Sequence, residues 1–88
     1  MGKTIWKFPL VLSDRIIVSM PKGAEILHVG LQGGTPCLWA LVDPDAPKIA
    51  REFRAFGTGH SIPDHPGGHV GTLLVMGDSL VIHIFASP

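Results

Sequence analysis

The sequence has no tyrosine, a single cysteine, Cys37, and only 16% charged residues among its 88. One cysteine cannot form an intrachain disulfide or a cysteine-based zinc site, which excludes a disulfide scaffold and favours a reducing compartment. Lysine plus arginine and aspartate plus glutamate both number seven, so no net charge attracts duplex nucleic acid or an acidic membrane. There is no apolar run of transmembrane length and no signal-peptide core, so we expect a cytoplasmic protein.

What the sequence does have is apolar residues, which make up 45% of the chain. Eighty-eight residues form one domain, spanning 1–88, and a chain this short buries only about 60% of the surface that its unfolded form exposes. This apolar content exceeds what a compact monomer of that size hides easily, so we expect a homo-oligomer. A dense β core with both sheet faces covered is the alternative.

Short runs rich in Ile, Val, Phe and Trp alternate with turn residues along the whole chain. Seven runs have strand length and none has a helical period; they cover residues 3–12, 15–20, 24–31, 36–42, 49–56, 70–76 and 79–85. This pattern predicts an all-β fold, a small antiparallel β-sandwich or barrel of about seven strands. A single helical turn fits around Asp45 to Arg51, where DPDAP resembles a capped start.

Two of these runs also indicate their place in a sheet. In the first, Trp6 and Phe8 alternate with Lys7 and its neighbours, and Pro9 lacks a ladder donor, so we expect an edge strand with one wet face. The last two runs, between 70 and 85, are apolar on both faces and require cover on both. Gly77 followed by Asp78 suits a tight type II′ turn between them.

The segment FGTGHSIPDHPGGHV, residues 56–70, holds three of the five histidines. His60, Asp64, His65 and His69 are ligand types for a metal such as zinc. However, a loop rich in glycine and proline does not preorganise imidazoles, and no HExxH pattern supports them. We therefore predict no metal site, and a small metal-dependent enzyme remains the third hypothesis for function.

The same segment favours anion binding more than metal binding. Gly57 and Gly59 free backbone amides to turn toward a ligand, Thr58 offers a hydroxyl, and His60 can donate a hydrogen bond to phosphate. Arg54 precedes this loop and is the arginine best placed to join it. The alternative is that the glycines only make the turn.

Trp39 could stack on a planar base, although its apolar neighbours also suit a core position, and the same two alternatives hold for Trp6. His28 and His83 lie within strand runs, where we expect hydrogen-bonded, structural histidines. Ser61 directly follows His60 and cannot receive its imidazole as a base, so nucleophilic catalysis finds little support. We expect a protein that is not an enzyme and that uses no cofactor.

The segments IWKFPL, MPKGAEILHVGLQGGTPCLWALVDPDAPK and FRAFGTGHSIPD together resemble a family of short uncharacterised bacteriophage and prophage proteins, classed only as a domain of unknown function. The likeness covers most of the chain. It implies a phage accessory protein in the cytoplasm of a bacterial host.

In that context we expect a non-catalytic homo-oligomer that sequesters a small phosphorylated nucleotide signal of host defence. Trp39 would stack on the base, while Arg54, Gly57, Thr58, Gly59 and His60 would surround the phosphate. The alternative is a structural or protein-binding module with no small ligand, in which the apolar hairpin 70–85 packs on a partner protein.

Overall fold

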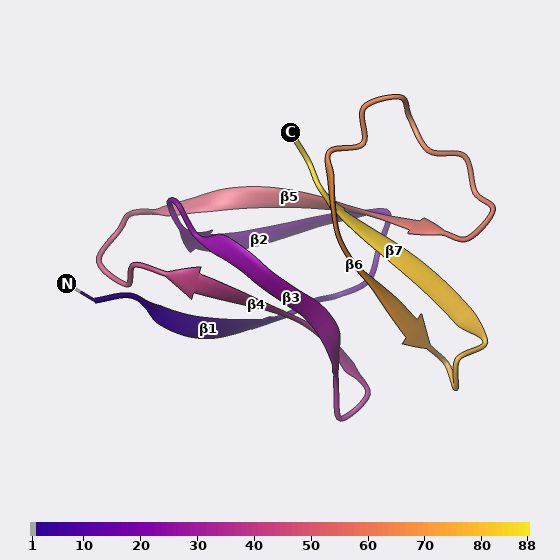
Figure 1. Ribbon diagram of the computed structural model, residues 1–88, viewed down its shortest axis with the longest axis horizontal. Coiled ribbons are helices and arrows are strands. Elements are labelled where there is room, and N and C mark those ends of the chain that lie inside the picture. The colour runs from indigo at the N-terminus through magenta and orange to yellow at the C-terminus, as the bar shows by residue number, and fades with distance from the viewer. Residues whose placement is uncertain (1) are drawn as a thin grey trace.

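The computed structural model describes residues 2–88, which fold into seven β-strands arranged as two antiparallel sheets (Figure 1). The strands are β1 (Thr4–Pro9), β2 (Arg15–Pro21), β3 (Glu25–Gln32), β4 (Thr35–Val42), β5 (Lys48–Gly57), β6 (Gly68–Val75) and β7 (Leu80–Ala86). One sheet has the order β1-β4-β3 and the other β2-β5-β7-β6. The predicted all-β fold of about seven strands is confirmed, as a sandwich. Residues 2–88 contain no helix long and apolar enough to cross a membrane.

The core lies between the two sheets and follows the alternation of side chains along each strand. In β2 the residues Ile16, Val18 and Met20 are buried, whereas Arg15, Ile17 and Ser19 are exposed. Phe53 of β5 and Leu38 of β4 are fully buried against them. Each such side chain contributes about 1.5–3 kcal/mol by leaving water, so these alternating positions select the fold.

The first strand behaves as its sequence predicts. β1 is an edge strand paired only with β4 among the described strands, and Trp6 and Phe8 pack on the core while Lys7 is exposed. Cys37 of β4 is buried, as expected of a small apolar side chain. The Lys7 ammonium reaches across the central strand and donates to the Gln32 side chain at 2.8 Å.

The helical turn expected at Asp45 to Arg51 does not form. Asp43 instead closes a turn, because its carboxylate accepts the Asp45 N–H at 3.0 Å and its carbonyl accepts the Ala46 N–H at 3.1 Å. Strand β5 then begins at Lys48. The physical reason is Pro47, which disfavours helical backbone at the residue before it.

The turn between β6 and β7 also differs from the prediction. Gly77 and Asp78 both have positive φ, at 63° and 69°, and the Ser79 N–H bonds the Met76 carbonyl at 3.2 Å. Positive φ at both central residues defines a type I′ turn, so the predicted type II′ turn is wrong. Aspartate tolerates this left-handed backbone better than most residues do, which is why the Gly-Asp order permits it.

A candidate ligand pocket at the end of the four-stranded sheet

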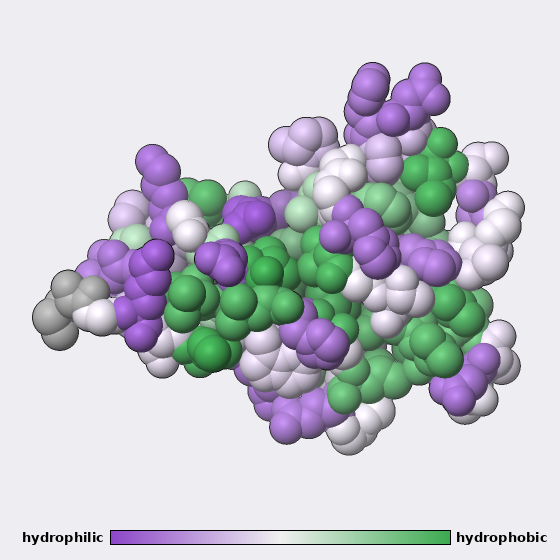
Figure 2. All heavy atoms as spheres, viewed as in Figure 1, coloured by the Kyte–Doolittle hydropathy of each residue, from purple (hydrophilic) through white to green (hydrophobic). Residues whose placement is uncertain are grey.

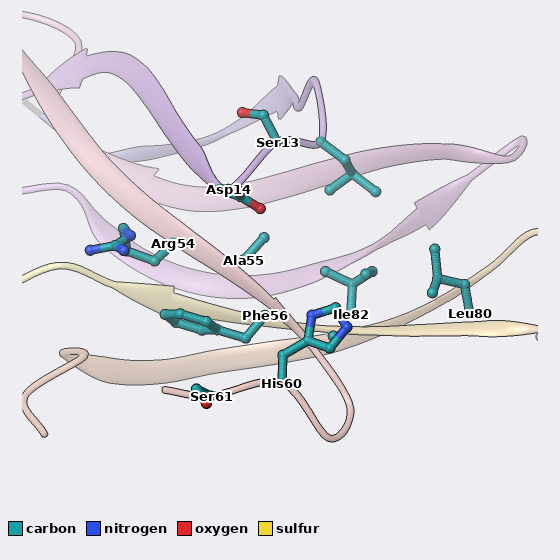
Figure 3. Close-up of a pocket in the computed structure, with 11 residues that line it drawn as sticks. Ser13, Asp14, Arg54, Ala55, Phe56, His60, Ser61, Leu80 and Ile82 are labelled. Carbon is teal, nitrogen blue, oxygen red and sulfur yellow. The ribbon is translucent and has the colours of Figure 1, made fainter. Parts of the chain in front are cut away.

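A cavity of about 440 Å³ opens on the inner side of the four-stranded sheet, at the end where β5 runs into the following loop (Figure 3). Its apolar lining comes from Leu12, Ala55, Phe56, Leu80 and Ile82. Its polar lining comes from Ser13 and Asp14 on one side and from His60 and Ser61 on the other. Cavities of this size, mostly apolar with a few polar groups, are typical small-ligand sites.

The cavity exists because β5 is longer than its neighbour. β2 begins at Arg15, opposite Arg54, so the last residues of β5 have no strand beside them on that side. The Asp14 carbonyl accepts the Ala55 N–H at 3.1 Å, and this contact ends the pairing between the two segments. The connection before β2 then turns away and leaves the hollow.

His60 is held at this hollow by a tight turn. The His60 N–H donates to the Gly57 carbonyl at 3.1 Å, and Gly59 has a φ of 87° that favours glycine. The imidazole lies so close to Gly57 that a Cβ there would be 3.0 Å from the ring. Gly59 thus makes the turn, while Gly57 gives the ring of His60 room to lie against the strand.

Arg54 and Thr58 project to the opposite face of the sheet. The Arg54 guanidinium lies 5.6 Å from the centroid of the Phe56 ring, and its Nε is buried without a hydrogen-bond partner in the described chain. Figure 3 shows the Arg54 side chain directed away from His60. The two residues therefore do not converge on one phosphate, although part of Arg54 lines the cavity.

The hydroxyl of Thr58 belongs to a network of hydrogen-bonded side chains on that outer face. Thr58 Oγ1 lies 2.8 Å from His83 Nε2, Thr72 Oγ1 lies 3.1 Å from His83 Nδ1, and His69 Nε2 lies 3.1 Å from the same Thr72 oxygen. The hydrogen-bonded role expected for His83 is confirmed. His28 differs from the expectation, because its side chain makes no hydrogen bond within residues 2–88; it is exposed and packs on a neighbouring ring.

That neighbouring ring is Trp39, which lies on the outer face of the three-stranded sheet. Its centroid is 5.8 Å from that of His28, and the strand register sets it beside Lys7 on β1. Trp39 is half-buried and does not line the cavity. The structure thus brings Gly57 and His60 together, with part of Arg54, and leaves Trp39 elsewhere.

The histidines of the loop do not converge either. Among residues 2–88, no group of three histidine, cysteine or acidic side chains is close enough to hold a metal ion. His69 belongs to β6 and to the hydrogen-bond network on the outer face. His60 lies against Gly57, and His65 is exposed in the loop between His60 and His69.

Eight residues that line the cavity were not expected from the sequence: Leu12, Ser13, Asp14, Ala55, Phe56, Ser61, Leu80 and Ile82. Ser13 and Asp14 carry only the signal of a turn, and Ser61 was considered only as a nucleophile. The sequence does not predict that the segment between β1 and β2 lies near the loop after β5, because their proximity depends on the pairing of β2 with β5.

Glu52, whose carboxylate lies beside the outer face, has a lowered pKa. Hydrogen bonds from the Arg15 and Ser87 side chains, followed by the charges of Arg15 and Arg54, lower the pKa of Glu52 below its ordinary value. The Ser87 hydroxyl donates to Glu52 at 3.0 Å, and the Ser87 N–H bonds its backbone carbonyl at 2.9 Å. Glu52 therefore ties the C-terminal end of the chain to the middle of β5.

The fold and cavity together define a small all-β sandwich domain with a pocket where one strand outruns its neighbour. The chain belongs to the family DUF7352, a domain of unknown function, whose model matches residues 1–88. The expected relation to an uncharacterised domain family is confirmed. No curated protein and no solved structure matches the chain.

Proposed function

We propose that this protein is a non-catalytic binding protein that holds a small phosphorylated nucleotide. The nucleotide lies in the cavity between residues 10–14, which connect β1 to β2, and the loop after β5. The observation that carries the proposal is the position of His60 at a cavity with an apolar lining. A planar base fits the apolar part, and a neighbouring imidazole and hydroxyls suit a phosphate.

The polar groups at the two sides of the cavity support one orientation of such a ligand. Asp14 offers a carboxylate, which accepts hydrogen bonds from the amino group or ring N–H of a base but repels a phosphate. His60 and Ser61 offer donors on the other side. The base therefore lies toward Asp14 and the phosphate toward His60 in the proposed complex.

This proposal revises the expected set of ligand-binding residues. Gly57 and His60 remain in it, and Ser13, Asp14 and Ser61 join it. Gly59 acts through the turn, whereas Arg54 and Thr58 have their polar groups on the other face. Trp39 could reach a ligand only from another copy of the chain.

The wider context of the proposal follows from the family resemblance. A phage accessory protein in the cytoplasm of its bacterial host, assembled as a homo-oligomer, can counter host defence by sequestering a signalling nucleotide. Sequestration requires only affinity and no bond-breaking step, which suits a cavity that offers hydrogen-bond donors and an apolar lining.

The test is native mass spectrometry of the purified protein with a panel of cyclic and linear nucleotides. We expect whole ligand masses on the wild type, and ligand released unchanged on denaturation. His60→Ala should weaken binding about tenfold or more, because it removes a hydrogen bond to a charged group. His65→Ala is the matched control, since that histidine is exposed in the same loop and does not line the cavity.

Arg54→Ala separates this arrangement from one in which the arginine clamps the ligand, and it should reduce binding less than His60→Ala does. Release of a converted ligand would indicate an enzyme. If the panel yields no bound mass, or if His60→Ala binds as well as His65→Ala, the nucleotide proposal is wrong.

A protein-binding module is the second candidate, and the tip of the last hairpin favours it. Met76 is 77% exposed and Leu74 of β6 is 47% exposed. Figure 2 shows apolar residues across the middle of one face of the molecule. Ile84 is fully buried, so a charge there would unfold the chain rather than test a partner surface. Met76→Lys is the better variant, and loss of a captured partner by this variant, together with a wild type that binds no nucleotide of the panel, would favour this candidate.

A further inference from the structure

The two sheets have four edge strands, and three of them carry features that oppose pairing with another strand. β1 has the charged Lys7 near its centre and ends in Pro9, β3 has an irregular register between Ile26 and His28, and β6 has another between His69 and Gly71. Proline and bulges are devices that protect sheet edges. β2 also ends in a proline, Pro21, but its register against β5 is regular from end to end and no residue between Arg15 and Pro21 carries a charge.

The backbone groups that β2 directs to its open side can be identified. Asp14 and Lys22, which flank β2, both bond toward β5, through Ala55 and Pro47 respectively. In an antiparallel ladder, bonded and non-bonded pairs alternate, so the even-numbered residues of β2 bond β5. Arg15, Ile17, Ser19 and Pro21 therefore direct their backbone groups to the open edge.

Both ends of this edge are already occupied. The Ser13 hydroxyl donates to the Arg15 carbonyl at 2.6 Å, and the Ala24 N–H donates to the Pro21 carbonyl at 3.1 Å. Proline has no N–H to offer. Within residues 2–88, the groups of this edge that remain without a partner are the N–H and C=O of Ile17 and of Ser19, together with the Arg15 N–H.

We propose that β2 pairs with β2 of a second copy of this chain, antiparallel about a two-fold axis at Val18. This register sets Ile17 of one copy opposite Ser19 of the other, so that each donates to and accepts from its partner. Axes at the two neighbouring positions fail, because one sets Ser19 opposite the occupied Arg15 carbonyl and the other sets Ile17 opposite Pro21. Two four-stranded sheets would join into one continuous sheet.

The side chains around this edge suit the same occupant. Ile17 is 52% exposed on the outer face, where it would meet the small Ser19 side chain of the other copy. A hollow of about 270 Å³ lies beside Arg15–Val18, lined also by Pro9, Leu10 and Val11, and leaves room next to the strand. This inference rests on the homo-oligomer of the proposed function but is independent of the nucleotide.

The experiment is sedimentation equilibrium of the wild type, Ser19→Pro and Ser19→Ala, followed by amide hydrogen exchange of the wild type. Ser19→Pro removes an N–H that points away from β5, so the chain's own ladder stays intact. Ser19→Ala is the matched control, because it removes the hydroxyl and keeps the N–H. We expect a dimer for the wild type and Ser19→Ala, and a monomer for Ser19→Pro with an unchanged circular dichroism spectrum.

In the wild type, the amides of Ile17 and Ser19 should gain protection as protein concentration rises, because pairing hides them only in the dimer. A monomer at all concentrations overturns the proposal, as does a dimer whose Ile17 and Ser19 amides exchange rapidly. If Ser19→Pro fails to fold, this exchange pattern decides alone. Native mass spectra record chain number and ligand separately, so a dimer without ligand refutes only the nucleotide proposal, and a monomer with ligand refutes only the interface.

Discussion

Among the glycines of residues 2–88, Gly67 is the one where an added Cβ has the least room. Its φ is 100°, and a Cβ there would lie 1.8 Å from the Ala86 carbonyl oxygen. Gly67→Ala should therefore cost at least about 2 kcal/mol of the free energy of unfolding, through the backbone conformation and the clash together. Urea denaturation measures this cost.

The neighbouring glycine is the matched control for that variant. A Cβ on Gly68 meets no atom within 4 Å, and its φ is outside the left-handed region. Gly68→Ala should leave the free energy of unfolding within about 0.5 kcal/mol of the wild type. Equal losses for the two variants would contradict the close approach of the loop to the C-terminal segment.

Glu52 gives a pH dependence whose direction is fixed by its lowered pKa. Because the folded state holds this carboxylate below its ordinary value of 4.5, the ionised form stabilises the fold at neutral pH, and this contribution disappears as pH falls from that value through the folded pKa. Glu52→Gln should be less stable than the wild type at pH 7, and the difference should vanish in acid. Urea denaturation across that range measures it.

Glu25 provides the control for this titration, since it is an exposed carboxylate at the start of β3. Glu25→Gln should keep the acid-dependent loss seen in the wild type. A difference between Glu52→Gln and the wild type that persists below the folded pKa would show that the amide disturbs packing instead of removing a charge interaction.

At the scale of single elements, the β6–β7 turn offers a test of its backbone type. Asp78 adopts a left-handed φ of 69° in the second central position, where glycine is favoured. Asp78→Gly should stabilise the protein, by about 1 kcal/mol or less, because the left-handed backbone then carries no steric cost. The melting temperature measures the effect.

Ser79 supplies the contrast within the same turn. Its hydroxyl donates to the Met76 carbonyl at 2.6 Å, and its φ is not in the left-handed region. Ser79→Gly should therefore lower the melting temperature. If both variants lower it, the strain assigned to Asp78 is absent.

The elements also separate what the sequence could predict from what it could not. Each strand run was visible because β-branched and aromatic residues lie between turn residues, and the wet face of β1 followed from its alternation. The cavity was not visible, because it depends on β5 extending beyond the start of β2. A difference in strand length appears only once the partners are known.

The candidate site shows the same limit at closer range. Alternation puts Arg54 and Phe56 on one face of β5 and Gly57 on the other, which could be read from the sequence. The return of His60 toward Gly57 depends on a turn with a left-handed Gly59, and the presence of Gly permits that turn without requiring it. The sequence therefore indicates this loop as a candidate site, but it does not predict the direction in which the loop turns.

At the scale of the whole molecule, the chain is a flat body with extents of 43 × 32 × 16 Å. Its two sheets supply one apolar core, and several large apolar side chains stay exposed outside it, among them Ile5, Val11 and Met76. Small domains with so little interior gain stability from association, which agrees with pairing along β2.

The one cysteine of the chain allows the local opening of the protein to be measured by thiol labelling. Cys37 is 2% exposed and lies on the central strand of its sheet, on the same face as Trp39. On that face the Lys7 ammonium bonds the Gln32 side chain across the strand. A thiol reagent can reach the sulfur only after the groups that cover it move, so the speed of labelling reports the rate or the equilibrium of this local opening under native conditions. The single native cysteine thus reports the local opening of the three-stranded sheet, and no further cysteine has to be introduced.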